Sequence, residues 1–518
     1  MLINSFKYLI HRKSSVSDDL SRAIQNMLAA EISIVSIVTG LFLWFGMTQI
    51  LLWRFLGAFS APTFLLATLV IFSVAALARR SLQHCAVSAI PVRRLIFCLA
   101  VSFVLLVLGG EGRFFYANVD WQVRDAVLRD MSINPWPFVY TARETPDMLR
   151  AGIGMYLAPS LAYKLAGPAA GDYAMLAQNA FILACILGIG STLFDDARAR
   201  LIGLVVLVAF SGMDVIGQIL VKDHLADHLE WWSVIQYSSH ITTLFWTPHY
   251  ALAGWLLAAL FMLHQQGKAP LGVLYAFAPM TALWSPLTML GILPFAAVAG
   301  FVAFARRRIR VDDAIITGGA ILLCAPTLLY LGAAGSSVGA RFYPVDPQYY
   351  APFQLLETAP FLLPLSFARN RRFGMWTFFA IACLLLLAPY IQIGDSIDFM
   401  MRATIPAFVI LAVLTADAIS GRSTVTNPMR SFLIGALVIG SITGLSEIRR
   451  ALTFPTSPRT ACSLFKAWDH HFANYPKDSH LAPLDTVPAI IRPSDPARVS
   501  AAEPGNCWTG EWREPSGI

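Results

Sequence analysis

Charged residues are scarce in this chain of 518 residues, in which Asp, Glu, Lys and Arg together make up 13%. Soluble domains carry about 25% charged residues, so the composition excludes an ordinary soluble protein. Hydrophobic residues make up 57%, and apolar runs of roughly 17–25 residues, each long enough to cross a bilayer, recur along the chain. The sequence therefore predicts an all-α, polytopic helical membrane protein.

Motifs for nucleotides, metals and secretion are also missing. The chain contains no Walker loop, Rossmann fingerprint, GxSxG elbow or haem motif, which argues against nucleotide-driven transport in this chain. Its seven cysteines form no CxxC or zinc-type spacing. No cleavable signal pattern is found, because residues 1–28 are polar and mixed in charge and precede the first apolar run. No cofactor is expected.

About thirteen transmembrane helices are predicted in a membrane domain covering residues 29–447. The apolar spans lie at about 29–53, 58–78, 94–110, 172–194, 200–220, 250–265, 270–285, 286–305, 313–334, 353–368, 373–392, 402–420 and 431–447. Several are short, and Pro279 and Pro286 lie in or between two of them. Broken helices of this kind are tolerated where they are buried in protein or line a cavity.

The basic residues between the spans predict an orientation, because Lys and Arg cluster in the cytoplasmic loops of membrane proteins. With residues 1–28 in the cytoplasm, every basic loop falls on the cytoplasmic side: Arg79 and Arg80, Arg93 and Arg94, Arg306 to Arg308, Arg369 to Arg372, and Arg422 and Arg430. The net charge of +7 is then an orientation signal, and no nucleic-acid partner is expected.

The same orientation puts the loops 111–171, 221–249, 335–352 and 393–401 and the tail 448–518 on the extracytoplasmic side. It requires that residues 151–165 lie along the membrane face as an interfacial or re-entrant helix. If they cross, a further span is needed or every later loop changes side. The tail is rich in Pro and polar residues and too short for a large core. We expect a small appendage with few regular elements, in which Cys462 and Cys507 could pair.

The loop 111–171 contains a charged, aromatic stretch, NVDWQVRDAVLRDMSINPWPFVY, at residues 118–140. Asp120 begins a predicted helix, in which Asp120 and Arg124, and likewise Asp125 and Arg129, have the i, i+4 spacing of ion pairs. Asn118 is placed to cap this helix. Two interpretations remain open: a solvated helix with ion pairs on its surface, or a helix that presents Asp120 as a general base just outside the membrane.

Asp214 lies inside a predicted span, where an ionisable group is costly and marks a functional site by default. The alternative is a buried polar group that pairs with a neighbouring helix.

In the loop 221–249, Trp231, Trp232 and Trp246 suit the aromatic belt at a membrane interface, or a stacking surface for a sugar. Candidate substrate-binding residues are Asp214, Arg124, Trp231, Trp232 and His240.

The same loop holds His224 and His228, whose i, i+4 spacing can bind a metal. Charged helices show this spacing often by chance, and no metal site is expected.

Arg341 and Arg402 are isolated cations on the predicted outer face, against the usual charge bias. Arginine meets phosphate through its planar fork, so both are candidate phosphate-binding residues. For Arg402, an ion pair with the nearby Asp395 or Asp398 is the alternative.

The layout resembles the C-type glycosyltransferases, polytopic enzymes that use polyprenyl-phosphate-linked sugars. The resemblance rests on the acidic first large loop, NVDWQVRDAVLRDM, followed by MYLAPSLAYKLAG, which would be the helix along the membrane face. It implies that Asp120 is the catalytic acidic residue. The stretches DWQVRDAVLRD, EWWSVIQYSSHITTLFWTPHYALAGW and DFMMRATIPAF also resemble a set of bacterial membrane proteins of poorly defined activity.

The resemblance implies an enzyme of the bacterial inner (plasma) membrane that transfers a sugar from a polyprenyl-phosphate donor to a glycan, lipid or protein acceptor at the outer face. Membrane lipid is a further expected partner. One alternative is a transporter or flippase for a lipid-linked saccharide, with a midplane site at Asp214 and the spans near Pro279 and Pro286. Another is a non-catalytic subunit of envelope-polysaccharide assembly. The enzyme interpretation requires Asp120 and Arg402 to face one common site.

Overall fold

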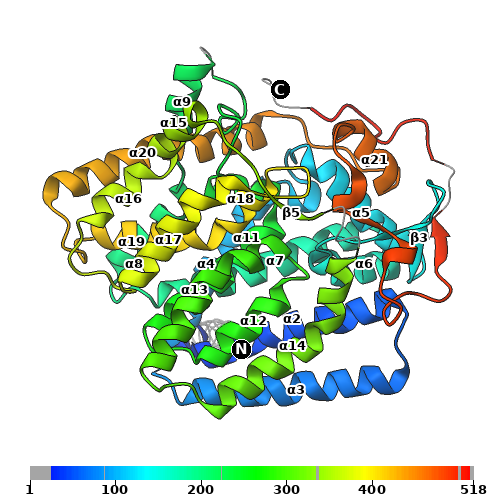
Figure 1. Ribbon diagram of the computed structural model, residues 1–518, viewed down its shortest axis with the longest axis horizontal. Coiled ribbons are helices and arrows are strands. Elements are labelled where there is room, and N and C mark those ends of the chain that lie inside the picture. The colour runs from blue at the N-terminus through cyan, green and yellow to red at the C-terminus, as the bar shows by residue number, and fades with distance from the viewer. Residues whose placement is uncertain (1–24, 87, 223–224, 334–337, 500–502, 514–518) are drawn as a thin grey trace, which may run out of the picture.

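The protein is mostly helical in its computed structural model, which describes residues 25–86, 88–222, 225–333, 338–499 and 503–513 (Figure 1). Seven helices in these residues are long and apolar enough to cross a membrane. They are α2 (Ile34–Leu56), α3 (Ala61–Gln83), α7 (Pro168–Ser191), the kinked pair α8 (Ala197–Ala209) and α9 (Asp214–Val221), α13 (Pro286–Ala305), α14 (Val311–Gly332) and α20 (Asn427–Thr453). Their length and composition fit the predicted helical membrane protein.

Shorter helices complete the bundle and its connections. They are α4 (Val92–Leu108), α5 (Asp120–Ile133), α6 (Gly154–Ala166), α10 (His240–Trp246), α11 (Pro248–Gln265), α12 (Leu271–Thr281), α15 (Pro347–Glu357), α16 (Ala359–Ser366), α17 (Met375–Leu387), α18 (Asp398–Ala403), α19 (Ile405–Ile419) and α21 (Leu464–His471). The short strands β1 (Glu31–Ser33) and β2 (Ala89–Pro91) form one antiparallel pair, and β5 (Ala340–Phe342) and β6 (Ile391–Ile393) form another.

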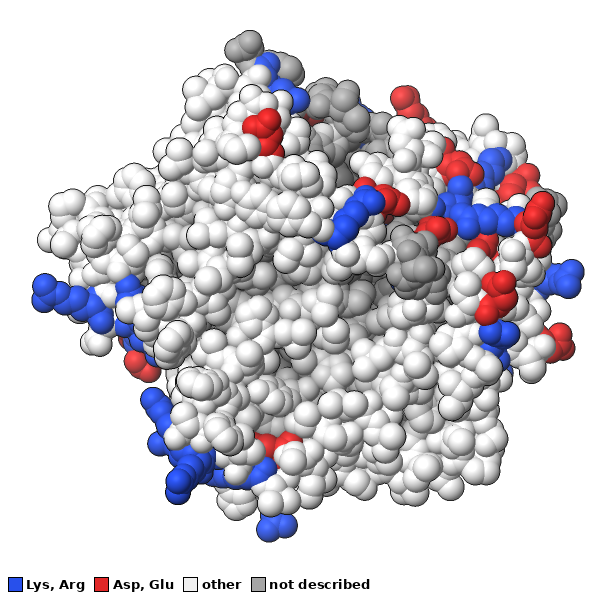
Figure 2. Space-filling model, viewed as in Figure 1, with Lys and Arg blue, Asp and Glu red and all other residues white. Residues whose placement is uncertain are grey.

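The predicted basic loops meet at one end of the bundle. Ser81 at the end of α3 bonds Asp312 at the start of α14, and Arg94 at the start of α4 bonds Ser191 at the end of α7. Figure 2 shows Lys and Arg gathered along the left and lower-left edges, and charges of both signs at the upper right. The surface between them is almost uncharged. We name the first region the basic end, and the opposite region, which holds the C-terminal residues, the tail end.

At the tail end, the loop after α4 and the C-terminal tail fold together. Strand β3 (Phe138–Tyr140) pairs antiparallel with β4 (Asp147–Leu149) and parallel with β8 (Ala497–Val499), while β4 pairs antiparallel with β7 (Leu481–Pro483). Helix α21 packs on α5, as Figure 1 shows at the right. The tail therefore folds together with the loop after α4, because two of the four strands of this sheet come from the tail.

Further contacts fix the tail. Cys462 and Cys507 form a disulfide, and the backbone N–H of Leu464 donates to the carboxylate of Asp130 on α5 over 2.8 Å. The hydroxyl of Tyr140 donates to the same carboxylate group. Asp130 is fully buried, and burial raises its pKa to about 6, although its hydrogen bonds act in the opposite direction.

Residues 151–165 form most of α6, which begins inside the bundle beside Trp284, whose ring packs on Phe45 in the middle of α2. The N–H of Gly154 donates to the carbonyl of Leu283, and the far end of α6 contacts the start of α7 near Gly171. A Cβ at Gly154 would lie 2.3 Å from the ring of Trp284, so only glycine allows this close approach. Helix α6 packs along α7 and against α5.

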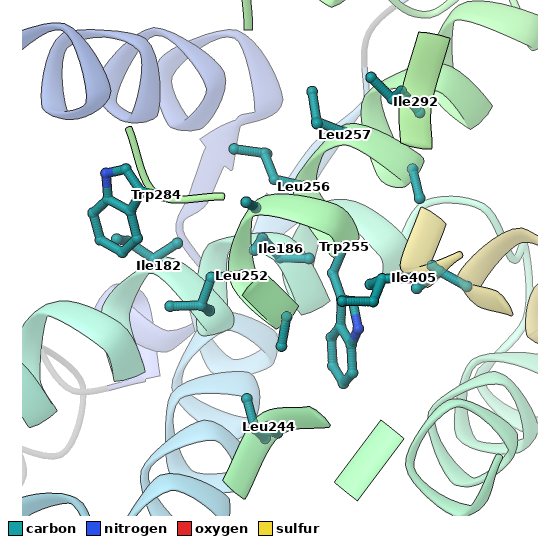
Figure 3. Packing of buried hydrophobic residues seen from close by; sticks show 14 of the residues in the cluster. Ile182, Ile186, Leu244, Leu252, Trp255, Leu256, Leu257, Trp284, Ile292 and Ile405 are labelled. Atoms are coloured by element: carbon teal, nitrogen blue, oxygen red, sulfur yellow. The ribbon is translucent and has the colours of Figure 1, made fainter. Parts of the chain in front are cut away.

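The core surrounds α11, which is buried on nearly every face. A helix that is apolar all round belongs in the interior of a bundle. Figure 3 shows side chains of α11 packed against neighbours from α7, α13 and α19; the labelled residues are Ile182, Ile186, Leu244, Leu252, Trp255, Leu256, Leu257, Trp284, Ile292 and Ile405. Core packing therefore holds α11 in place, and neighbouring elements pack against its start.

Candidate active site at the start of the central helix

The junction between α10 and α11 leaves backbone carbonyls open. Thr247 separates the two helices with φ −142° and ψ 60°, and Pro248 begins α11 at a position where its missing N–H costs nothing. The last carbonyls of α10 therefore lack helical partners. The carbonyl of Phe245 accepts from the side chains of Asn118 and Trp121, each over 2.9 Å. Helix α5 thus docks on the end of α10.

The predicted ion pair between Asp120 and Arg124 is present, with 3.0 Å between Oδ2 and Nη2. The side chain of Asn118 accepts from the N–H of Asp120 over 3.1 Å. The prediction that Asn118 caps α5 is wrong, because Val119 stands at the cap position and no side chain caps the helix. Nε of Arg124 donates to the carbonyl of Trp246 over 2.9 Å. Burial alone would lower the pKa of Arg124, but neighbouring Tyr156 and Asp120 raise it above its ordinary value, so this side chain stays charged.

Arg402 reaches the same junction from α18. It is buried, its Nη1 donates to the hydroxyl of Thr247 over 3.3 Å, and its Nη2 lies 3.4 Å from the carboxylate of Asp398. The guanidinium lies over the ring of Tyr250, 4.9 Å from its centroid, a favourable cation–π geometry. Within the described residues, Nε of Arg402 has no hydrogen-bond partner. The guanidinium is therefore held at the junction by Thr247, Asp398 and Tyr250.

His249 and Tyr250 join the two arginines. Nε2 of His249 lies 3.4 Å from Nη1 of Arg124, and His249 is in the electrostatic field of both Arg124 and Arg402. Tyr250 interacts electrostatically with Asp120, Asp398 and both arginines. Two guanidiniums and two carboxylates thus surround one His–Tyr pair. Such a group can hold an anion beside a carboxylate base.

The tail completes this site with His480, the residue just before β7. Burial, then the nearby charges of Arg124 and Arg150, lower the pKa of His480 to about 4, so it is neutral at pH 7. The N–H of Arg150 donates to the carbonyl of His480 over 2.7 Å. The C-terminal tail therefore contributes a side chain to a site that begins at residue 120.

The structure brings three residues that the sequence predicted to the junction between α10 and α11: Asp120, Arg124 and Arg402. Sequence reasoning missed His249 and Tyr250, although the Thr-Pro-His-Tyr break before a long apolar run was a usable signal. Arg341 lies apart, in β5. It is 56% exposed and pairs with Asp395 over 2.9 Å.

A second polar cluster surrounds Asp214, which is buried at the start of α9. Its carboxylate accepts from Ser211 and from Thr443 of α20, each over 2.9 Å. The indole N–H of Trp232 lies 3.3 Å from both Asp214 and Glu357. Asp214 is thus paired with a neighbouring helix. The expectation that Trp232 belongs to an interfacial belt is wrong, because it is buried between two acidic residues.

Trp246 connects the second cluster to the first. Its indole N–H donates to Glu447 over 2.8 Å, and Glu447 also bonds Arg450 over 2.7 Å and His228 over 2.8 Å. Trp231 packs edge-on against His228 with 4.4 Å between ring centroids. The belt assignment is therefore wrong for Trp246 too, since it is buried; Trp231 is half-buried.

His240, another candidate, is buried inside the bundle. Its Nδ1 donates to the carbonyl of Leu207 over 2.6 Å, and its ring packs beside Phe210 and Trp255, with centroids 5.4 Å and 5.2 Å away. These contacts place His240 away from the junction groups and give it a packing role.

The expected pairing of Asp125 with Arg129 is wrong. Asp125 pairs with Arg113 over 2.8 Å, and Arg129 pairs with Asp130 over 3.0 Å. The cause is the turn at Gly112 and Arg113, both of which have positive φ; this turn folds Arg113 back onto α5.

Across the described ranges, no group of three or more His, Cys, Asp or Glu side chains is placed to hold a metal. The predicted partner of His228, His224, lies outside those ranges.

Comparisons with protein-family models, with curated proteins and with solved structures found no match to this chain. A functional interpretation of the junction therefore depends on its own geometry. The decisive relationship is that Asp120 and Arg402, 282 positions apart by their residue numbers, both interact with Tyr250.

Proposed function

We propose that the chain crosses a bacterial plasma membrane about thirteen times, with the basic end in the cytoplasm. The seven long helices would supply seven crossings, and the shorter apolar helices in the same bundle would supply others. The gathering of arginines at one end supports this orientation. The tail would then face the extracytoplasmic compartment, where the Cys462–Cys507 disulfide suits an oxidising environment. We also propose that residues 151–165, which lie in α6, do not cross the membrane.

Within this topology, we propose that the protein is a glycosyltransferase that uses a polyprenyl-phosphate sugar as donor. The donor would enter from the bilayer, and the acceptor hydroxyl would come from the outer compartment. Asp120 would take the proton of that hydroxyl while its oxygen attacks the anomeric carbon. The bond from that carbon to the phosphate oxygen would break, with inversion, and polyprenyl phosphate would leave.

Arg402 would stabilise the negative charge that develops on the leaving phosphate. Its buried position and its fixed orientation over Tyr250 suit this role. Arg124 would hold the Asp120 carboxylate in one orientation through their 3.0 Å ion pair. The observation that carries the proposal is this meeting of a partly exposed carboxylate and a buried guanidinium around one His–Tyr pair.

A transfer assay in vesicles tests the proposal. The protein would be given a panel of polyprenyl-phosphate sugars with glycan and lipid acceptors, and D120N would be compared with D395N. Asp395 is a carboxylate in an exposed ion pair outside the site. We expect D120N to lose about 10²–10⁴-fold in turnover, as for a general base, and D395N to keep its activity. Undiminished turnover in D120N, or no transfer by the unaltered protein, would overturn the proposal.

A second candidate is proton-coupled movement of a lipid-linked saccharide, and the second polar cluster favours it. Asp214 and Glu357 are buried, and both lie 3.3 Å from the indole N–H of Trp232. Paired acidic groups inside a membrane protein are typical of proton relays.

A further inference from the structure

An apolar cavity of about 240 Å³ lies between α4, α7, α8, α11 and α19. Helix α4 packs on α7, whereas α8 packs on α19, so α4 and α8 stand on opposite sides of this cavity. Phe97 of α4 and Leu201 of α8 line it and are 52% and 58% exposed. The cavity therefore opens sideways between α4 and α8, where the proposed orientation puts the hydrocarbon of the membrane.

Two arginines line the end of the cavity that lies at the basic end of the bundle. Arg94 is in the first turn of α4 and Arg200 is in the first turn of α8, and their charges act on one another. Arg94 donates to the hydroxyl of Ser191 over 3.5 Å. Arg200 donates to the backbone carbonyl of Asp195 over 2.9 Å.

The nearby carboxylates form no salt bridge with Arg94 or Arg200 within the described residues. The side chains of Asp195 and Asp196 lie 2.6 Å and 3.7 Å from Arg422. Glu31 acts on Arg94 and Asp196 on Arg200, but within the described part of the chain neither arginine has a carboxylate within the 4.0 Å of a salt bridge. Two arginines that line one apolar cavity are complementary to an anion that carries a hydrocarbon chain.

We propose that this cavity binds an anionic phospholipid, with its phosphate between Arg94 and Arg200 and an acyl chain along Leu207, Trp255 and Val409. A free phosphate would leave the apolar walls uncovered, and a zwitterionic lipid would bring a cation to the arginines. A polyprenyl-phosphate sugar bound here would hold its sugar at the basic end, far from Asp120. The cavity is therefore a lipid site separate from the proposed donor site.

Native mass spectrometry of the purified full chain tests this proposal. The protein would be equilibrated with mixed micelles that contain phosphatidylglycerol or phosphatidylcholine, and bound lipid would be counted. We expect retention of one phosphatidylglycerol and no phosphatidylcholine. R94Q/R200Q should weaken that retention at least tenfold. The matched control R306Q/R308Q removes two exposed arginines from the same end of the bundle, outside the cavity, and should keep the lipid.

A second variant tests the apolar part without a change of charge. A Cβ at Gly190, which lines the cavity, would meet no atom within 4 Å, so G190L places a side chain in the cavity at little steric cost. It should also release the lipid, while inorganic phosphate should not displace lipid from the unaltered protein. Equal retention of both lipids, loss in R306Q/R308Q equal to that in R94Q/R200Q, or full retention in G190L would overturn the proposal.

Discussion

The indole of Trp246 donates a hydrogen bond to the carboxylate of Glu447, 2.8 Å away. The backbone carbonyl of Trp246 accepts from Arg124, the partner of Asp120. One residue is therefore fixed on one side to the last part of α20 and on the other side to the helix that carries the proposed base. The position of Asp120 depends on an ion pair in the interior that it does not contact.

The first prediction concerns that interior ion pair. The R450L substitution leaves the buried carboxylate of Glu447 without its closest cation and should lower the free energy of unfolding by about 3–5 kcal/mol. The neighbouring Arg449 is 55% exposed and pairs with Asp227, so R449L should cost less than about 1 kcal/mol. Unfolding of both variants in mixed micelles, followed by tryptophan fluorescence, measures the difference. Equal losses in the two variants would contradict it.

The second prediction concerns Arg402. Lysine keeps the charge but loses the planar fork, so R402K should raise the KM for the donor and lower kcat, and R402A should lower kcat by roughly 10²–10³-fold. R341K is the matched control, because Arg341 is exposed and apart from the junction; its kinetics should be unchanged. Steady-state kinetics against donor concentration separates the two parameters. A similar loss in R341K would remove the special role of Arg402.

The third prediction separates the two candidate functions. E357Q replaces one of the two buried carboxyl groups beside Trp232 with an amide of similar size, so we expect a folded protein with normal sugar transfer. If the protein moves a lipid-linked saccharide, that movement should no longer respond to a proton gradient. Vesicle assays with and without an imposed gradient measure this. Movement that responds to the gradient as strongly in E357Q as in the unaltered protein would exclude a proton role for Asp214 and Glu357.

The fourth prediction concerns pH and the tail. Asp130 has a pKa of about 6 in the folded protein, above its ordinary value of 3.8, so the folded state binds its proton more tightly than the unfolded state does. This contribution is fully present below pH 3.8 and is lost as pH rises through 6; by linkage it amounts to about 3 kcal/mol. Protection of the tail from protease should therefore decline between pH 4 and pH 7.

The D130N variant is the test of that cause. Its side-chain oxygen can still accept from Leu464, and it does not ionise, so the decline should disappear. D469N, which alters an exposed carboxylate of the tail, should keep the decline of the unaltered protein. An unchanged pH profile in D130N would show that other groups are responsible.

Local signals in the sequence predicted part of this site. The i, i+4 spacing of Asp120 and Arg124 and the long apolar runs need no tertiary information. The partner of Asp125 was predicted wrongly, because Arg113 reaches it through a turn that its spacing does not reveal. Trp232 and Trp246 were predicted wrongly for a similar reason: their acidic partners lie 125 and 201 residues away. Aromatic composition alone does not distinguish an interfacial tryptophan from one that bonds a buried acid.

The parallel pairing of β3 with β8 has a consequence for biogenesis. Residues 138–140 are made before α6 and the later helices of the bundle, whereas their partners at 497–499 follow all of those helices in the chain. Until then β3 and β4 form an isolated hairpin, which is marginal in water. His480 and the disulfide also follow the bundle in the chain. A premature stop codon shortly before residue 480 would therefore remove His480 and β7 from a site whose first residue, Asp120, had already been synthesised.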